Sequence, residues 1–502
     1  MSIPSQLRPN FEPSSTYSGP LQLTYDKSVN SFQLNSPSVA VIGGGISGLA
    51  AAHRLTELEP SWSVTLFEST QRLGGVIGTD REDGFLIERA ADNFLQGATA
   101  PWAVSLCERI GFKNQLIPTN EDLRGAKIYW NGKLHSVPAG FQLMAPSQLV
   151  PLLTTSLLSP LGKLRLICEP LIREADVAEE RSLASFAKRR LGREAYERLV
   201  EPLVAGIYTA DPEQLSVDAA LPQMVQLVRE HGSLYRGMRK RRERQPKSTE
   251  RGARYSLFVA PRDGMSSLVD ALSGQLKTTE IRCQTQVEQL RREEDSWNLQ
   301  TQEGRSKFDA VIVSTPNYVT ANLLHDELPE LAQELQAVEY ASSAVVCLAF
   351  EKRQISRPLG AFGCVIPSAA GRPILAISCA SAKFPDRAPA GMELFRVFLG
   401  GALRPEIVDL SDAELIATAT SELSELLGIQ SAPHLARVVR WPRAMPQYAV
   451  GHLARLERIR SQLPASGRLQ LAGNSFSGVG IPQCVREGEA AAERIVAALK
   501  PS

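Results

Sequence analysis

Long apolar runs are missing from this 502-residue sequence: no stretch of eighteen or more uninterrupted apolar residues occurs, which excludes an ordinary transmembrane helix. The net charge is only +1, because 55 Lys and Arg residues are balanced by 54 Asp and Glu residues. The chain as a whole therefore does not attract nucleic acid, and we expect no nucleic-acid partner. The seven cysteines include no CxxC pair, which indicates thiols in a reducing, cytoplasmic compartment and no metal site.

Residues 1–37 also lack an apolar run, and they are rich in Ser, Pro, Gln and Asn, which predicts a disordered tail without a signal peptide. An organelle transit peptide would be rich in Arg and poor in acids. This segment has only Arg8 and Lys27, set against Glu12 and Asp26. Organelle targeting is therefore not predicted.

The most informative stretch runs from Val39 to Gly75. An apolar strand leads into a turn and a helix whose first residues are Gly43, Gly44, Gly45, Ile46, Ser47 and Gly48. In this pattern the glycines permit a tight turn, the approach of a pyrophosphate and the close packing of helix on strand. A second strand ends at Glu68, whose carboxylate can accept hydrogen bonds from both hydroxyls of an adenosine ribose. The spacing predicts a Rossmann-like dinucleotide-binding fold.

The residues after the second strand resemble a known family. Glu68, Arg72, Gly74 and Gly75 follow the E-x-x-x-R-x-G-G pattern of the flavoproteins that include amine oxidases, phytoene desaturases and protoporphyrinogen oxidases. The resemblance implies FAD as the cofactor. It also implies that Arg72 and the paired glycines pass close to the flavin's diphosphate and ribityl chain.

Further segments are similar to flavin contacts of the same family. Ala90, Ala91, Asp92 and Asn93 correspond to a segment that lies against the flavin, although the family pattern prefers Gly-Pro where this chain has Ala90 and Ala91. The backbone of Val287 is expected at the adenine and Trp441 beside the isoalloxazine. A second glycine-rich turn before the last helix supplies Gly473, Val479, Gly480 and Ile481.

Three other residues narrow the resemblance to the protoporphyrinogen and coproporphyrinogen oxidases. Gly206 lies in a run, 205–216, similar to their S-G-V-Y-A-G-D-P-x-x-L-S signature, in which the first glycine lets the chain pass close to the porphyrin ring. Val365 and Phe398 lie in similar strand segments that supply an aliphatic and an aromatic wall around the macrocycle. An amine oxidase or a carotenoid desaturase should lack the segments around Gly206 and Phe398.

The resemblance implies a six-electron, oxygen-dependent oxidation of a porphyrinogen to a porphyrin in haem biosynthesis, releasing H₂O₂. Protoporphyrinogen IX is the first substrate expected and coproporphyrinogen III the alternative, while a flavin-binding protein without catalytic activity stays open. No group of His, Glu or Lys residues in the sequence indicates a general base, so no catalytic residue is assigned. The implied partners are the porphyrinogen and O₂, and both a homodimer and hand-over to a ferrochelatase are left open.

We predict an α/β fold of three parts, in keeping with a chain that is 43% hydrophobic. A discontinuous FAD-binding domain comprises residues 38–125, 255–330 and 435–500. A helical insertion covers residues 126–254, and a mixed-sheet, substrate-binding domain covers residues 331–434.

Two segments of the insertion leave alternatives open. The uncharged, Pro-broken stretch Val137 to Gly162 is read equally as short core helices or as a surface that dips into a membrane or forms the mouth of an apolar substrate tunnel. The basic run Arg236 to Arg254 is read as a solvated mobile loop, with a contact to anionic lipid as the alternative. Peripheral attachment to the cytoplasmic face of the inner membrane is thus an open expectation.

Overall fold

The computed structural model describes residues 36–97, 99–142, 144–148, 150–172, 180–243 and 258–500. Residues from Pro37 onward form one compact unit. Apart from its last two residues, the predicted disordered tail lies outside the described part of the chain.

A five-stranded parallel sheet lies at the centre of the nucleotide-binding part. Its strands follow the order β12-β2-β1-β16-β22. Their bounds are Glu280–Arg282 (β12), Ser63–Phe67 (β2), Ser38–Ile42 (β1), Ala310–Val313 (β16) and Leu469–Leu471 (β22). β1 and β16 are apolar and almost wholly buried, as expected for strands of a parallel sheet covered on both faces. The predicted Rossmann-like fold is confirmed.

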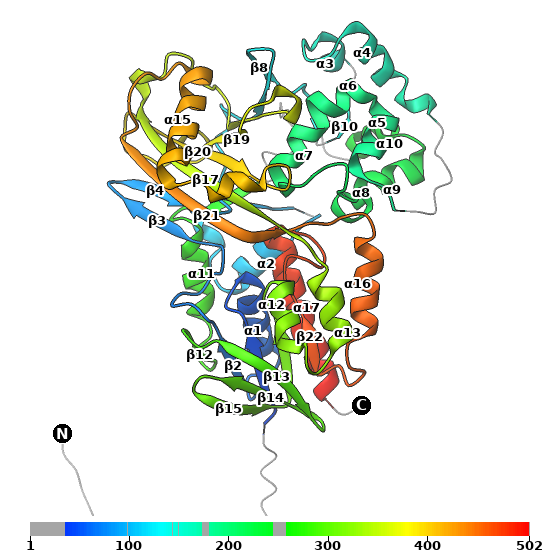
Figure 1. Cartoon of the computed structure of the whole chain (residues 1–502), viewed down its shortest axis with the longest axis vertical. Coiled ribbons are helices and arrows are strands. Elements are labelled where there is room, and N and C mark those ends of the chain that lie inside the picture. Colours follow the sequence, from blue (N-terminus) through cyan, green and yellow to red (C-terminus); the bar gives the residue numbers. More distant parts are fainter. Residues whose placement is uncertain are drawn as a thin grey trace, which may run out of the picture. The chain divides into compact units, whose positions relative to one another are not determined.

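Helices cover one face of this sheet and a smaller sheet covers the other. The first layer contains α1 (Ile46–Leu58), α2 (Trp102–Arg109), α11 (Met265–Ser273) and α17 (Ile481–Leu499). The second contains the antiparallel strands β13 (Val287–Glu293), β14 (Ser296–Thr301) and β15 (Gly304–Phe308), with the helices α12 (Asn317–Leu324), α13 (Pro329–Gln336) and α16 (His452–Ser461). Figure 1 shows α1 and α17 side by side.

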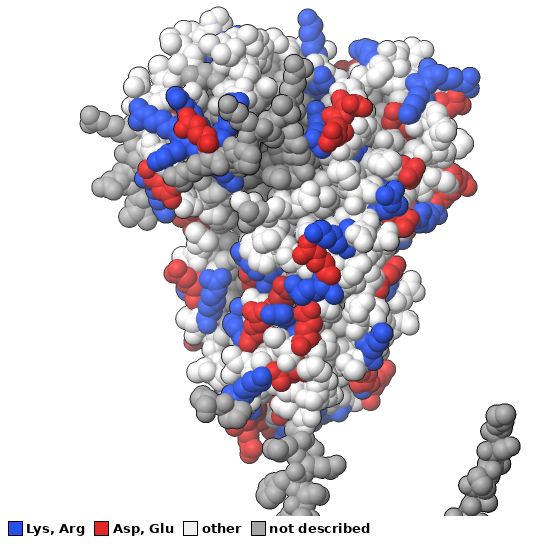
Figure 2. Space-filling model, turned by 180° about the vertical axis from the view of Figure 1, so that it is seen from behind, with Lys and Arg blue, Asp and Glu red and all other residues white. Residues whose placement is uncertain are grey.

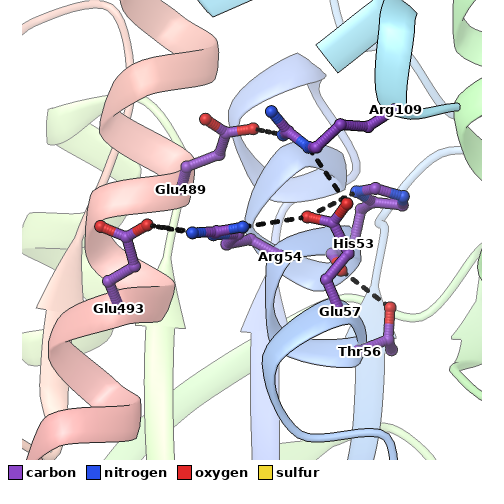
Figure 3. Close-up of polar contacts among 7 residues, drawn as sticks. All are labelled: His53, Arg54, Thr56, Glu57, Arg109, Glu489 and Glu493. Carbon is purple, nitrogen blue, oxygen red and sulfur yellow. Dashed lines mark hydrogen bonds and ion pairs between the residues drawn. The ribbon is translucent and has the colours of Figure 1, made fainter. Parts of the chain in front are cut away.

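An ion-pair network ties α1, α2 and α17 together (Figure 3). The Arg54 guanidinium lies 2.7 Å from a carboxylate oxygen of Glu493, and Arg109 lies 3.0 Å from Glu57 and also pairs with Glu489. Single exposed pairs contribute about 0–1 kcal/mol each, but a network fixes several side chains at once. The network therefore fixes the position of α17 against α1 and α2.

The second large sheet is mixed and has seven strands, in the order β21-β17-β20-β19-β18-β7-β8. The strands are Leu435–Pro446 (β21), Tyr340–Glu351 (β17), Met392–Gly400 (β20), Ile374–Cys379 (β19), Gly363–Val365 (β18), Ala126–Trp130 (β7) and Lys133–Ser136 (β8). Helix α15 (Asp412–Leu427) packs on one face, and the hairpin of β3 (Thr79–Glu82) and β4 (Phe85–Glu88) packs on the other.

Strand pairing places two segments differently from the sequence prediction. Residues 435–446 were grouped with the FAD-binding segments and residues 126–136 with the helical insertion, but both belong to the seven-stranded sheet. The difference arises because strand partners far apart in the chain leave no local sequence pattern. Asn131 and Gly132 form the turn between β7 and β8, with φ values of 48° and 74°, and an Asn-Gly pair favours such a hairpin turn.

The helical part packs around its own apolar core. Its helices are α3 (Val150–Thr154), α4 (Pro160–Ile167), η2 (Glu169–Leu171), α5 (Leu183–Leu191), α6 (Arg193–Ala195), the π-helix η3 (Tyr196–Val200), α7 (Glu201–Tyr208), α8 (Val217–Ala220), α9 (Pro222–His231) and α10 (Leu234–Glu243). The remaining elements of the described residues are short: β5 (Phe94–Leu95), η1 (Lys113–Gln115), β6 (Leu116–Pro118), β9 (Phe141–Gln142), β10 (Ala145–Pro146), β11 (Phe258–Pro261), η5 (Lys352–Gln354), η6 (Ser368–Ala370), α14 (Ala380–Lys383) and η7 (Pro405–Asp409).

The basic run corrects one interpretation made from sequence. Its first part, from Arg236 to Glu243, belongs to α10 and is not a loop, while residues 244–254 lie outside the described residues. Arg and Lys favour helices, and Ser233 Oγ accepts a hydrogen bond from the Arg236 N–H at the start of the helix. Among the helices that the structure describes, none is both long and apolar enough to cross a membrane.

Candidate functional site

The glycine-rich turn after β1 leaves space where a cofactor phosphate is expected. Gly43 has a φ of 104°, which favours glycine, and a Cβ added at Gly48 would lie 1.9 Å from the Gly43 carbonyl oxygen. A Cβ added at Gly45 would meet nothing within 4 Å. Helix α1 starts there at Ile46 without a side-chain cap and without an acid in its first turn. Its first free N–H groups, including that of Ser47, can therefore meet an anion.

The Glu68 carboxylate fastens this turn. One oxygen accepts a hydrogen bond from the Gly44 N–H at 2.8 Å, and the other accepts from the N–H and hydroxyl of Thr70, each at 2.8 Å. The Ser69 hydroxyl lies a further 3.5 Å from the oxygen that Thr70 contacts. Since each carboxylate oxygen can accept about two hydrogen bonds, the oxygen bound to Gly44 keeps capacity for a ribose hydroxyl. Thr285 donates its N–H to the Glu68 carbonyl, which brings the start of β13 at Val287 near the expected adenosine position.

Replacing Glu68 tests its role in cofactor binding. We expect Glu68→Ala to weaken FAD binding by about 1–3 kcal/mol, roughly 5-fold to 150-fold in Kd, because a charge-assisted acceptor is lost and the turn's N–H groups lose their partner. Glu68→Gln should have a smaller effect, since the amide oxygen can still accept. Titration of the apoprotein with FAD measures both, and equal loss in the two variants would contradict the expectation.

The loop after Glu68 lies directly beside the first turn. Gly74 donates its N–H to the Gly44 carbonyl at 2.8 Å, and a Cβ added at Gly75 would lie 3.2 Å from the Gly45 Cα. The Arg72 guanidinium donates to the Ile77 carbonyl at 2.7 Å and to the Gly75 carbonyl at 2.6 Å. Arg72 therefore shapes this loop, and its contact with the cofactor stays a prediction. A cavity of about 360 Å³ adjoins the loop at Arg72 and Leu73.

A second helix N-terminus completes the cradle. Gly473 follows β22 with a φ of 141°, Val479 is part of the turn, and α17 begins after Gly480 at Ile481 without a side-chain cap or an acid in its first turn. Since β1 and β22 belong to one parallel sheet, both turns lie at its carboxyl edge. Two uncapped helix N-termini at one edge suit an anionic dinucleotide, so the residues present fit FAD.

Side chains that the sequence did not single out hold the second turn. The Tyr448 hydroxyl donates to the Asn474 carbonyl at 2.5 Å. The Tyr448 ring stacks on His452 with a centroid distance of 4.3 Å, and His452 Nε2 lies 3.0 Å from the Ser475 carbonyl. Burial lowers the pKa of His452 to about 4, so its ring is neutral at pH 7. Tyr448 and His452 stand 25 and 21 residues before Gly473, too far along the chain for a local pattern to indicate this contact.

The segment from Ala90 to Asn93 is held from the seven-stranded sheet. The indole Nε1 of Trp441 donates to the Arg89 carbonyl at 2.9 Å, and Arg396 donates to the Ala90 carbonyl. Ala91 packs against the apolar core of the nucleotide-binding part. The structure thus brings the predicted residues 90–93 and Trp441 together, and their contact with the flavin remains a prediction.

The three predicted pocket residues meet at the seven-stranded sheet. Val365 on β18 pairs with Ala376 on β19, which pairs with Phe398 on β20. Cross-strand partners point to the same face of a sheet. Val365 and Phe398 therefore lie on either side of the small Ala376, on strands that are roughly 10 Å apart. Gly206 on α7 is exposed, and a Cβ there would meet only Val365, at 3.6 Å. The sequence missed Ala376 because strand patterns do not reveal cross-strand register.

Glu201 begins α7 and is a buried carboxyl that the sequence did not indicate. It is 4% exposed and accepts a hydrogen bond from the Ser368 N–H at 3.1 Å. Burial raises the pKa of Glu201 to about 7. The π-helix η3 directly precedes it, and such helices are frequent at functional sites.

The raised pKa of Glu201 predicts a pH dependence of stability. The folded state binds the proton more tightly than the unfolded state, so this contribution is full below about pH 4.5 and is lost as the pH rises through 7. Glutamine cannot ionise, so the variant Glu201→Gln does not lose this stability at high pH. The free energy of unfolding of Glu201→Gln minus that of the wild type should therefore increase from pH 5 to pH 8. Urea denaturation across this range measures it, with exposed Glu243→Gln as control. A pH-independent difference would refute the assignment.

Comparison with known proteins gives matches over nearly the whole chain. A family model described as flavin containing amine oxidoreductase matches residues 46–496. A coproporphyrinogen III oxidase of Bacillus subtilis (strain 168) is 33% identical over 459 residues, covering 90% of this chain and 96% of the relative. The chloroplastic protoporphyrinogen oxidase 1 of Arabidopsis thaliana is 31% identical, covering 89% and 85%. A crystal structure from Exiguobacterium sp. 255-15 has a TM-score of 0.80 and 31% identity, covering 92% and 98%.

Proposed function

The chain belongs to the flavin-containing amine oxidoreductase family and to its porphyrinogen oxidase branch, and from this premise we propose that it removes six electrons from a porphyrinogen with O₂ as acceptor. It is an oxidoreductase of haem biosynthesis with FAD as cofactor. The balance is one porphyrinogen and three O₂ giving one porphyrin and three H₂O₂. Bound flavin supplies the electron transfer between the two.

The observation that carries the proposal is the common face of Val365, Ala376 and Phe398. These side chains offer an apolar surface whose centre is the small Ala376, and the exposed backbone of Gly206 lies next to Val365 at one end of it. A flat macrocycle fits against this sheet face, where the glycine adds no side chain to block its edge. The role of these residues is to bind and orient the ring and to exclude water from it.

Two substrates each have a specific observation in their favour. The Bacillus subtilis relative and one from Staphylococcus aureus (strain NCTC 8325 / PS 47), 31% identical, are both named coproporphyrinogen III oxidase. Relatives from plants are named protoporphyrinogen oxidase, and an exposed apolar surface on the helical part suits delivery of the less soluble protoporphyrinogen IX. Porphyrin fluorescence and O₂ uptake with each purified porphyrinogen separate the two. A FAD-loaded protein that oxidises neither would refute the proposed function.

The exposed apolar surface lies on α4 and η2. The exposed fractions of Leu161, Leu164 and Leu171 are 78%, 59% and 77%. Carboxylate oxygens of Glu169, on η2, accept hydrogen bonds from the first N–H groups of α10, at 2.9 Å from Leu234. The basic helix α10 therefore begins beside this surface and exposes a set of cations: Arg236, Arg239, Lys240 and Arg242.

This arrangement supports peripheral attachment to an anionic membrane, as on the cytoplasmic face of an inner membrane. Each cation near such a surface contributes about 1 kcal/mol, and shallow burial of leucines adds to it. Charges of both signs are interspersed over the face seen in Figure 2, so attraction to the membrane has to come from a local surface.

Flotation with anionic liposomes tests the attachment. We expect Leu161→Glu together with Leu164→Glu to reduce the floating fraction at least about tenfold, because two apolar contacts become charged at the interface. Leu453→Glu is the matched control, since Leu453 is 42% exposed on α16. High salt should weaken wild-type binding in part. A wild-type protein that does not float at low salt would contradict the attachment.

A further inference from the structure

Three charged side chains meet in the interior between the two sheets. The Lys383 ammonium lies 2.9 Å and the Arg396 guanidinium 3.3 Å from the same carboxylate oxygen of Asp92. The exposed fractions of these side chains are 17% for Lys383, 2% for Arg396 and 11% for Asp92. Burial alone would raise the pKa of Asp92, but the two cations lower it to about 2, so the carboxylate is charged at every physiological pH.

This cluster joins the predicted flavin segment to the predicted pocket wall. Arg396 donates to the carbonyl of Ala90 and lies 5.2 Å over the ring of Phe398. Arg396 and Phe398 are two residues apart on β20, so they share one face of the sheet. The cluster is therefore in contact with both the segment 90–93 and the wall of the pocket.

The cluster carries an excess of positive charge. Two cations surround one carboxylate, and Arg396 Nε is buried without a hydrogen-bond partner in the described part of the chain. The other charged groups that face it are Arg387, whose guanidinium donates to the Pro261 and Arg262 carbonyls, and Glu88, whose pKa is raised by burial to about 7. Arg81 and Asp386 also lie near Arg387, and their opposite charges cancel. Even with Glu88 ionised, the remaining groups are three cations against two carboxylates.

A buried, uncompensated positive charge is unfavourable unless an anion arrives nearby. Reduction of the flavin adds electrons to the one group that is expected against residues 90–93. A fixed cation close to a group stabilises the more negative of its two states, and the effect is strong where water is excluded.

We propose that Lys383, Asp92 and Arg396 act as positioning residues whose net positive charge stabilises the reduced flavin and raises its midpoint potential. This inference rests on the proposed function, because it requires FAD to be bound against the segment 90–93. The substrate oxidation is then favoured by the protein's own fixed charge, without a general acid or base.

Midpoint potentials of the FAD-loaded protein test the inference. Lys383→Gln removes one cation but leaves the pair of Asp92 and Arg396, and we expect a more negative potential. Lys383→Arg restores the charge and should return the potential to the wild-type value. Asp92→Asn removes the anion and should shift the potential in the positive direction. Lys307→Gln is the matched control, because Lys307 is 58% exposed and pairs with Glu293 on the surface.

The outcomes also separate this inference from the proposed function. A protein that binds no FAD, or that binds it and oxidises neither porphyrinogen, sinks the proposed function. If porphyrinogen is oxidised and the melting temperature falls in Lys383→Gln while the potential stays at the wild-type value, the cluster is only structural. Shifts of the same sign in Lys383→Gln and Asp92→Asn would likewise overturn the electrostatic role.

Discussion

Gly206→Leu should abolish porphyrinogen oxidation while leaving FAD binding and thermal unfolding nearly unchanged. The glycine is exposed on α7, and a Cβ there would lie 3.6 Å from Val365, so a larger side chain would project over the Val365 wall without disturbing the core. The leucine would displace a ring that rests on this sheet face. Turnover should fall more than about 100-fold, because misplacement by an ångström already has that effect.

Gly206→Ala is the matched control for this variant. A single methyl at ordinary van der Waals distance from Val365 leaves room for a substrate, so turnover should be only partly reduced. The flavin absorbance spectrum, the melting temperature and the rate of porphyrin formation are measured for both. Loss of FAD or of folding in Gly206→Leu would show that Gly206 is structural and that the pocket lies elsewhere.

A second large effect is expected from two neighbouring glycines that act for different reasons. Gly48→Ala places a methyl 1.9 Å from the Gly43 carbonyl oxygen, so the first turn of α1 must move away from β1. Overpacking of this kind costs about 1–3 kcal/mol or more. The variant should melt at a lower temperature even without cofactor and should bind FAD poorly.

Gly45→Ala gives the contrasting result. Gly45 has ordinary angles, φ of −71° and ψ of 175°, and its added methyl meets no protein atom within 4 Å. The apoprotein should fold like the wild type. FAD affinity should fall by about 10-fold to 100-fold, because the methyl takes the space of a phosphate and weakens charge-assisted hydrogen bonds. Equal melting temperatures and equal FAD affinities for Gly45→Ala and Gly48→Ala would contradict this division of roles.

Local features of the chain could be predicted from sequence, because they depend on neighbours within a few residues. The turn from Gly43 to Gly48 and the strand that ends before Glu68 each carry their own pattern of apolar residues and glycines, and both are found where predicted. The hairpin turn at Asn131 and Gly132 is another feature of this local kind.

Contacts between distant segments could not be predicted in the same way. An alternating strand pattern shows that Phe398 and Val365 each face one side of a sheet, but nothing in either strand names Ala376 as the residue between them. Buried polar groups such as Glu201 and Arg396 look like surface residues in the sequence. Their partners come from other elements, and only the folded chain brings those partners within hydrogen-bond distance.

The order of strands in the central sheet has a consequence for how the protein is made. β1 is formed from the first described residues, while β22 and the start of α17 come from the last part of the chain. Ribosomes add about 5–20 residues per second, so about 20 to 90 seconds separate the two halves of the cofactor cradle. From its synthesis until β22 follows, β16 has only one of its two neighbours and exposes apolar surface. FAD can be enclosed only after β22 and the start of α17 have been synthesised, and a chain truncated before β22 should aggregate instead of waiting for its cofactor.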